Sequence, residues 1–548
     1  MLNYRRLTEA ERAIWRAVEA GTPVQLPLDG PEEGDPAAGA AWGRDRQVRA
    51  QLLDELVVGD NGPKGSRPRA LKLAGARITG ALNLEAATLA CPLSLRNCFF
   101  DQAINLREAQ ASAVRLHGCH APALDGEQFH SLGNLELKGF TAHWVNLISA
   151  RIGGELSLDG AHLGNRDSRG VVLRADRITV EGSMSCDSFT THGIIALTSA
   201  KVGGILIFAH ARLSNPGNRV LVAHRLTVGQ SVFCNNGFTA DGEITLTNAH
   251  IGGALQLPDA RLTNRNGCAL QANGISVAWD INCTEGFVAQ GKVSLAGAQI
   301  GSRVDFREAR INDRDRQHGL ALDLEAARMR ELYLLPLVAP NATINLTNAQ
   351  VGSFHDDPAT WPPTLKLRGF VYERLENDSV SVTDRLRWLT KDLGGYAPQL
   401  YEQLAGVYRK AGREEDARTV AIAKQRRRRR ILKPAGRLWS RLLGLTVGYG
   451  YKTWRVGVWL AVLVGLGWWI FDRAYPAHLV AAKPPGQRPS FHAGLYTLDL
   501  LVPFADFGYQ NAWIPTGWAR LCYVTWTLAG WVLITAVVAA LTGLFKRD

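Results

Sequence analysis

The sequence lacks the short motifs that mark the commonest enzymes and secreted proteins. Its eight cysteines include no CxxC pair, so we expect no disulfide framework and a reducing compartment. Residues 1–20 are charged and helical in pattern, without the apolar core of a signal peptide. No GxGxxG lies between a strand and a helix, and no GxSxG is present. We therefore predict no catalytic residues and no cofactor, and the sequence favours a binding protein while leaving an enzymatic activity open.

A metal site is not predicted either. His117, Cys119 and His120 offer three potential ligands within four residues. Alternation along an extended strand sends neighbouring side chains to opposite faces, so these three should not converge on one ion.

The middle of the chain is built on a long repeat. An alanine is followed two residues later by Ile or Val and then by glycine, and the steps between copies are 50, 49, 49 and 51 residues. The copies begin at Ala150, Ala200, Ala249, Ala298 and Ala349. A second alanine follows eleven residues after each of the first four, and a phenylalanine recurs at Phe140, Phe189, Phe238 and Phe287. Markers that share one period indicate a repeat architecture.

A finer spacing predicts the fold of this region. Pairs of inward-facing residues two apart recur every five or six residues, clearest in Ala76/Ile78, Leu82/Leu84 and Leu93/Leu95. Residues i and i+2 share a face of an extended chain, so the backbone must turn a corner after each pair. Such a chain winds into a parallel β-helix solenoid with about 25 residues in each coil. Each long repeat is then two coils, and residues 71–372 form about a dozen.

This stretch resembles the degenerate form of the pentapeptide-repeat family. The resemblance implies a right-handed quadrilateral β-helix. A twisted sandwich of short strands is the alternative fold, but recurrence across four units favours the β-helix.

Residues 1–70 are predicted to form a helical cap and linker. Thr8 and Glu11 have the spacing of a capping box, which opens a first helix. A second amphipathic helix is predicted over residues 44–58. The open end of a β-helix exposes unpaired hydrogen-bonding groups, so we expect these helices to cover its first coil.

Polar insertions follow four of the later alanines in the same phase of the repeat. The same phase places them on one side of the solenoid, where they would form a ligand-binding ridge. The alternative is that corners simply need polar turn residues. The predicted ridge contains Arg166, Arg169, Arg219, Arg265, Arg314 and Arg316.

Residues 373–445 are predicted to form a helical hairpin cap with its turn at Ala411-Gly412, followed by a polybasic juxtamembrane segment. The formal net charge is +12, and much of it gathers near residue 430. The position of this cluster before an apolar segment favours anionic lipid headgroups over nucleic acid as its partner. The predicted headgroup contacts are Arg426, Arg427, Arg428, Arg429, Arg430 and Lys433.

Residues 446–548 are predicted to form a membrane domain. Two uncharged apolar stretches, residues 456–471 and 521–545, are predicted to be transmembrane helices. Their outer flanks are basic, which predicts that both termini and the solenoid are cytoplasmic at a bacterial plasma membrane.

Between the spans, residues 491–504 are apolar and suit either a re-entrant segment or an amphipathic surface helix. In the re-entrant arrangement Asp499 and Asp506 could attract cations. No carbonyl-rich filter chemistry occurs between Ser490 and Gly517, so we expect no cation current.

From residues 7–11 to the paired C-terminal spans, the chain resembles a bacterial (actinobacterial) group of membrane-anchored pentapeptide-like proteins. The stretches at Val48 (VRAQLL) and Leu73 (LAGARITGALNL) carry the resemblance. Some of these proteins are labelled membrane-associated oxidoreductase. We predict a membrane-tethered scaffold with a protein partner on the solenoid and homo-oligomerisation as an open alternative. The other hypotheses are a channel-like module gated by the solenoid and an oxidoreductase.

Overall fold

The structure is a computed structural model of the whole chain. It describes residues 7–20, 22–27, 34–58, 70–164, 170–312, 319–377, 379–431, 454–482, 484, 489–502, 504 and 506–545. The chain divides into two compact units, residues 1–400 and 401–548, which are considered separately below.

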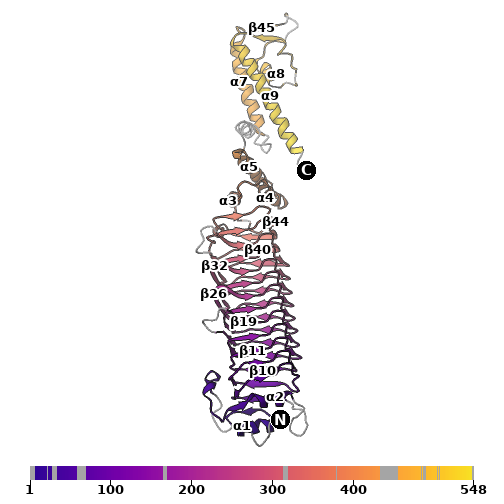
Figure 1. Cartoon of the computed structure of the whole chain (residues 1–548). Helices are drawn as coiled ribbons and strands as arrows, with labels where there is room; N and C mark the ends of the chain where they lie inside the picture. The colour runs from indigo at the N-terminus through magenta and orange to yellow at the C-terminus, as the bar shows by residue number, and fades with distance from the viewer. Residues whose placement is uncertain are drawn as a thin grey trace. The chain divides into compact units, whose positions relative to one another are not determined.

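The first unit is a parallel β-solenoid of about 13 turns, as predicted (Figure 1). Each turn of its central part contributes four short strands, and each strand pairs with its counterpart in the next turn. β13 (Leu135–Glu136) pairs with β17 (Leu156–Ser157), and β14 (Thr141–Ala142) with β18 (His162–Leu163). β15 (Trp144–Asn146) pairs with β19 (Val171–Arg174), and β16 (Arg151–Ile152) with β20 (Thr179–Val180).

Two turns make one long sequence repeat, as predicted. Leu156 pairs with Met184, which lies 28 residues later, and Met184 pairs with Leu206, a further 22 residues along. The two steps together match the 50-residue step from Ala150 to Ala200. The longer turn is the one that carries the polar insertion.

The corners explain the alanine marker. The residue before each marker alanine has a left-handed backbone, with φ of 57° at Ser149, 57° at Ser199 and 55° at Asn248. The next N–H, that of the marker alanine, donates to the carbonyl oxygen three residues earlier at 3.1 Å in all three corners. The alanine side chains are fully buried. A larger side chain would have no room inside this tight wall.

The glycine marker has a different cause, which is the close approach of successive turns. A Cβ atom at Gly203 would lie 2.2 Å from the carbonyl oxygen of Glu181 in the preceding turn. At Gly301 the corresponding distance to the carbonyl oxygen of Ala278 would be 2.0 Å. Because real Cβ atoms do not come this close, glycine is the residue that fits these positions.

The interior is a continuous apolar column. Its inward positions hold fully buried phenylalanines, including the four predicted markers, and the thiols of Cys98, Cys119, Cys186 and Cys283 are buried among them. Burial raises the pKa of the Cys186 thiol well above its usual value. Buried in this way, these cysteines pack as small apolar residues.

The N-terminal cap differs in part from the prediction. The Thr8 and Glu11 capping box is present, and it opens α1 (Glu9–Ala20). The second helix does not span residues 44–58. Its first part is instead β2 (Gln47–Arg49), which pairs with β4 (Arg77–Thr79), and α2 covers only Ala50–Val58. The edge of the first coil offers unpaired backbone groups, and their hydrogen bonds favour a strand over another helical turn.

The last turns of the solenoid are closed by α3 (Val382–Thr390) and the residues after it. The backbone N–H of Leu365 donates to Lys391 O at 2.9 Å, and that of Leu393 donates to Leu365 O at 2.8 Å. Arg385 of α3 is buried and binds Asp356 through two hydrogen bonds of 2.6 and 2.7 Å. This ion pair joins α3 to the β-helix interior.

The second unit is helical. α4 (Pro398–Lys410), which begins just before the unit boundary, and α5 (Glu414–Ile431) flank the turn at Ala411-Gly412. α7 (Trp454–Ala474), α8 (Ala493–Leu501) and α9 (Trp518–Phe545) lie side by side (Figure 1). β45 (Leu479–Ala481) and β46 (Trp513–Pro515) form an antiparallel pair.

In the part of the chain that the structure describes, one helix is long and apolar enough to cross a membrane. It covers Gly457–Ala474 within α7.

Candidate ligand-binding groove on the solenoid

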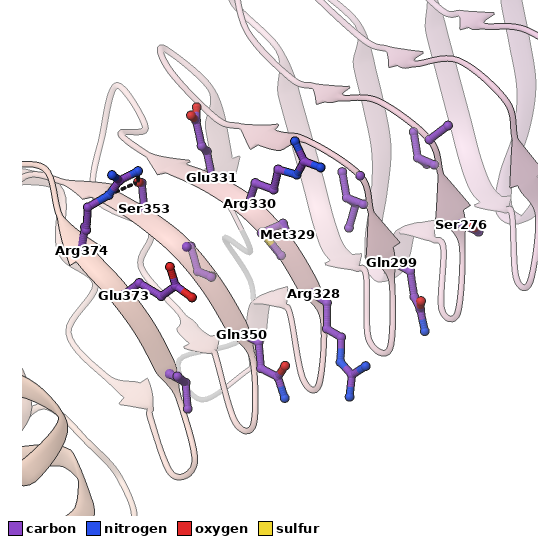
Figure 2. A pocket seen from close by; sticks show the side chains of 17 residues that line it. Ser276, Gln299, Arg328, Met329, Arg330, Glu331, Gln350, Ser353, Glu373 and Arg374 are labelled. Carbon is purple, nitrogen blue, oxygen red and sulfur yellow. Dashed lines mark hydrogen bonds between the residues drawn. The ribbon is translucent and has the colours of Figure 1, made fainter. Parts of the chain in front are cut away.

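A groove of about 800 Å³ lies along one face of the last turns of the solenoid (Figure 2). It crosses β33 (Ser276–Val277), β36 (Gln299–Ile300), β40 (Arg328–Leu334), β42 (Gln350–Asp356) and β44 (Val371–Leu375). Five adjacent strands about 4.8 Å apart give it a length of about 19 Å.

The sequence repeat itself creates the hollow. In the strands that cross it, the outward position two residues after Gln299 is Gly301, and that after Gln350 is Gly352. Neither glycine has a side chain to fill the face. The flanking column runs in register through Ser276, Gln299, Arg328, Gln350 and Val371. The floor is therefore backbone at Gly301 and Gly352, and one wall is a column of four polar side chains that ends at Val371.

Two guanidinium groups are the available positive charges of the groove. Arg328 and Arg330 are exposed, and neither forms an ion pair with any residue that the structure describes. Figure 2 shows Arg328 extending beside Gln299 and Gln350, whereas Arg330 extends toward the other side. A ligand lying on Gly301 and Gly352 would thus meet positive charge on both sides, and at the β44 end the carboxylate of Glu373.

Of the other charged groups of the groove, Arg374 and Glu331 are engaged, whereas Glu373 is exposed at the β44 end. Arg374 donates hydrogen bonds of 3.0 and 3.2 Å to Ser353 Oγ and forms an ion pair with Glu376. Glu331 accepts a 3.1 Å hydrogen bond from the Tyr333 hydroxyl. Burial and this hydrogen bond raise the pKa of Tyr333, so the phenol stays neutral and keeps donating.

The predicted arginine ridge is partly described. β26 (Arg212–Val222) and β32 (Arg261–Gln271) contain two of the insertions and lie in one ladder, separated by β29 (Thr239–Thr245). Both insertions therefore emerge on the same side of the solenoid. Arg219 and Arg265 are exposed there. Arg166, Arg169, Arg314 and Arg316 lie outside the described residues.

Local hydrogen bonds account for the shape of these two insertions. The side-chain amide of Asn215 donates to Arg219 O at 2.6 Å, and that of Asn264 donates to Cys268 O at 2.9 Å. Arg265 donates from Nε to Gln290 Oε1 at 3.2 Å. This is the polar turn chemistry of the alternative interpretation, so the groove is the better candidate site.

The remaining predicted site residues are in the second unit. Arg426 to Arg430 lie in the last turns of α5, with Arg426 and Arg428 exposed, and Lys433 lies outside the described residues. Asp499 is buried, and its carboxylate accepts hydrogen bonds from backbone N–H groups. Asp506 is exposed.

The three residues considered for zinc do not converge. His117 Nε2 lies 2.7 Å from Glu136 Oε2, the Cys119 thiol is buried, and the His120 ring stacks on Phe99. Among the residues that the structure describes, no group of three His, Cys, Asp or Glu side chains could hold a metal ion.

The groove was not predicted from the sequence. Arg330 lies in the turn between those of Gly301 and Gly352, at the outward position that Glu181 and Ala278 hold in earlier intermediate turns, so the repeat gives no signal for it. No family model, no curated protein and no solved structure matches this chain.

Proposed function

We propose that this protein is a membrane-tethered β-helical binding protein and that the groove holds an extended acidic segment of a partner protein. The observation that carries the proposal is the pair of available guanidinium groups, Arg328 and Arg330, over a floor opened by Gly301 and Gly352. Guanidinium groups recognise carboxylates with strong, directional hydrogen bonds.

The dimensions of the groove suit an extended chain. A length of about 19 Å accommodates about six residues at about 3.3 Å each. The glycine positions expose backbone, so a partner backbone could approach closely there. Gln299 and Gln350 could donate and accept hydrogen bonds along its length. The four short strands in each turn of the central part also support the resemblance to pentapeptide-repeat proteins.

The tether is proposed to be a hairpin of two spans, α7 and α9, in a bacterial plasma membrane. Large apolar side chains are exposed along both helices, including Val458, Val462 and Leu466 on α7 and Leu521 and Leu528 on α9. Lipid chains would cover them. The arginines at the end of α5 would contact anionic headgroups on the cytoplasmic side, where the solenoid and the C-terminus are placed by the charge distribution.

Site-specific photo-cross-linking tests the groove. A photoreactive residue at Gln350 should give a defined adduct in native membranes, whereas one at Lys201, on the same outward column but several turns away, should not. The double variant Arg328→Glu/Arg330→Glu should reduce the adduct at least tenfold, because both available cations become repulsive to an acidic partner.

The matched control is Arg151→Glu/Lys201→Glu, which changes the net charge equally and acts on the same column of exposed residues. It should leave the adduct at position 350 unchanged. Equal losses in the two double variants would show that net charge alone attracts the partner. That result would refute the groove as the binding site.

A further inference from the structure

The short helix α8 is not exposed as a surface helix would be. Of its nine residues, Ala493, Tyr496, Thr497, Asp499, Leu500 and Leu501 are buried. The helix packs against both α7 and α9, within a cluster that includes Phe471 and Trp526. The depth of α8 in a membrane can therefore be measured against its two long neighbours.

The position of α8 along α9 gives a first estimate of its depth in the membrane. Gly530 lies directly against the end of α8, since a Cβ atom there would be 2.6 Å from Leu501 O. Arg520, the charged residue near the start of α9, marks the level of the headgroups. Gly530 lies ten residues further along, which is about 15 Å at about 1.5 Å per residue. The end of α8 is then half-way through a hydrocarbon layer of about 30 Å.

The position of α8 along α7 gives a second estimate of this depth, and the two estimates agree. A Cβ atom at Gly467 would lie 2.3 Å from Thr497 Cγ2 of α8. Gly467 precedes the charged Arg473 by six residues, or about 9 Å. From Thr497 to Leu501 α8 descends another 6 Å or so. Both neighbours thus place Leu501 at about 15 Å below the charged residues.

The chain after α8 returns alongside it. The buried Asp499 carboxylate accepts hydrogen bonds from the backbone N–H groups of Phe507 at 3.0 Å, Tyr509 at 3.0 Å and Gln510 at 2.8 Å. These contacts hold non-helical backbone at nearly the depth of Asp499. Gly508 N–H donates to Asp506 at 2.8 Å, and the Asp506 side chain is exposed on this returning segment.

An exposed carboxylate cannot face lipid at this depth. A charged side chain near the middle of the hydrocarbon is costly, and irregular backbone is tolerated there only inside protein or beside water. Two long helices and one half-length helix cannot enclose water by themselves. A second copy of the chain supplies the missing wall.

We propose that α8 is a re-entrant helix and that Asp506 faces a water-filled space enclosed by several copies of this chain. The proposal rests on the membrane tether proposed above. In a single copy the loop bearing Asp506 would face lipid, whereas in the assembly it faces the enclosed water. The space is lined by carboxylates rather than by a carbonyl filter, so it attracts cations, while no current across the membrane is expected.

Thiol accessibility tests this arrangement in the full-length chain in liposomes. Cys522, the one cysteine of residues 401–548, is replaced by serine to set the background rate. Asp506→Cys is then compared with Leu528→Cys. Leu528 lies on α9 at about 12 Å below Arg520 and is exposed, so it is a lipid-facing control of similar depth.

A membrane-impermeant thiol reagent should modify Asp506→Cys at least tenfold faster than Leu528→Cys, and native mass spectrometry should show more than one copy. If both cysteines react slowly, or the protein is a monomer, the water-filled space is refuted and the tether is not. If both react quickly, the helices are not embedded in lipid, and the tether is refuted as well.

Discussion

Replacing Arg385 with alanine is expected to destabilise the last turns of the solenoid by about 3–5 kcal/mol. Arg385 and Asp356 are both buried, and the Trp361 indole N–H also donates to Asp356 Oδ2 at 2.8 Å. Removing the guanidinium leaves a carboxylate buried without its counter-charge, which is among the most costly single changes in a protein interior. Denaturant unfolding and hydrogen exchange over residues 350–375 measure the effect.

The control is Arg387→Ala on the same helix. Arg387 is exposed and pairs with Asp384 three residues earlier, an arrangement worth well under about 1 kcal/mol. Exchange over residues 350–375 should therefore stay unchanged in this variant. Similar protection in the Arg385 and Arg387 variants would contradict the account of α3 as the closing helix.

Replacing Ile251 with aspartate is expected to cost several kcal/mol. Ile251 is buried, and its neighbours in the adjacent turns are Val228 and Val277. An aspartate there would have no hydrogen-bond partner and no access to water. The backbone could not move to expose it, because it is hydrogen-bonded to the turns on both sides. The loss should appear as a large fall in the unfolding midpoint of the purified protein.

Arg265→Asp places the same acid on an exposed insertion. This side chain makes one hydrogen bond, to Gln290, so the change in stability should stay within about half a kcal/mol. Comparable destabilisation by the Ile251 and Arg265 variants would refute the assignment of inward and outward positions.

The solenoid was predictable because its signals are local and repeated. The alanine marker predicted the corners, where a left-handed residue such as Ser149 must be followed by a small buried side chain. The pairing of Leu156 with Met184 and of Met184 with Leu206 follows from the same period. The marker glycines are required by the close approach of successive turns, a reason for their recurrence that the sequence alone did not reveal.

The groove and the closing ion pair depend on residues that are far apart in the sequence. Arg328, Gln350 and Gln299 become neighbours only through the register of successive turns. Asp356 and Arg385 are 29 residues apart in the sequence, and Arg385 lies on α3, after the repeat has ended, so no period predicts the pair. The predicted helix over residues 44–58 was wrong at its start because Val48 completes a strand pair with Ile78.

The placement of the chain across a membrane is the central claim, and two topology reporters test it most directly. One is fused after Asp548, and the other is inserted at Pro484-Pro485 between the proposed spans. We expect the first to report the cytoplasmic side and the second the opposite side. The basic residues lie before the first span and after the second, and basic flanks stay on the cytoplasmic side. Both reporters on the same side would contradict the two-span tether.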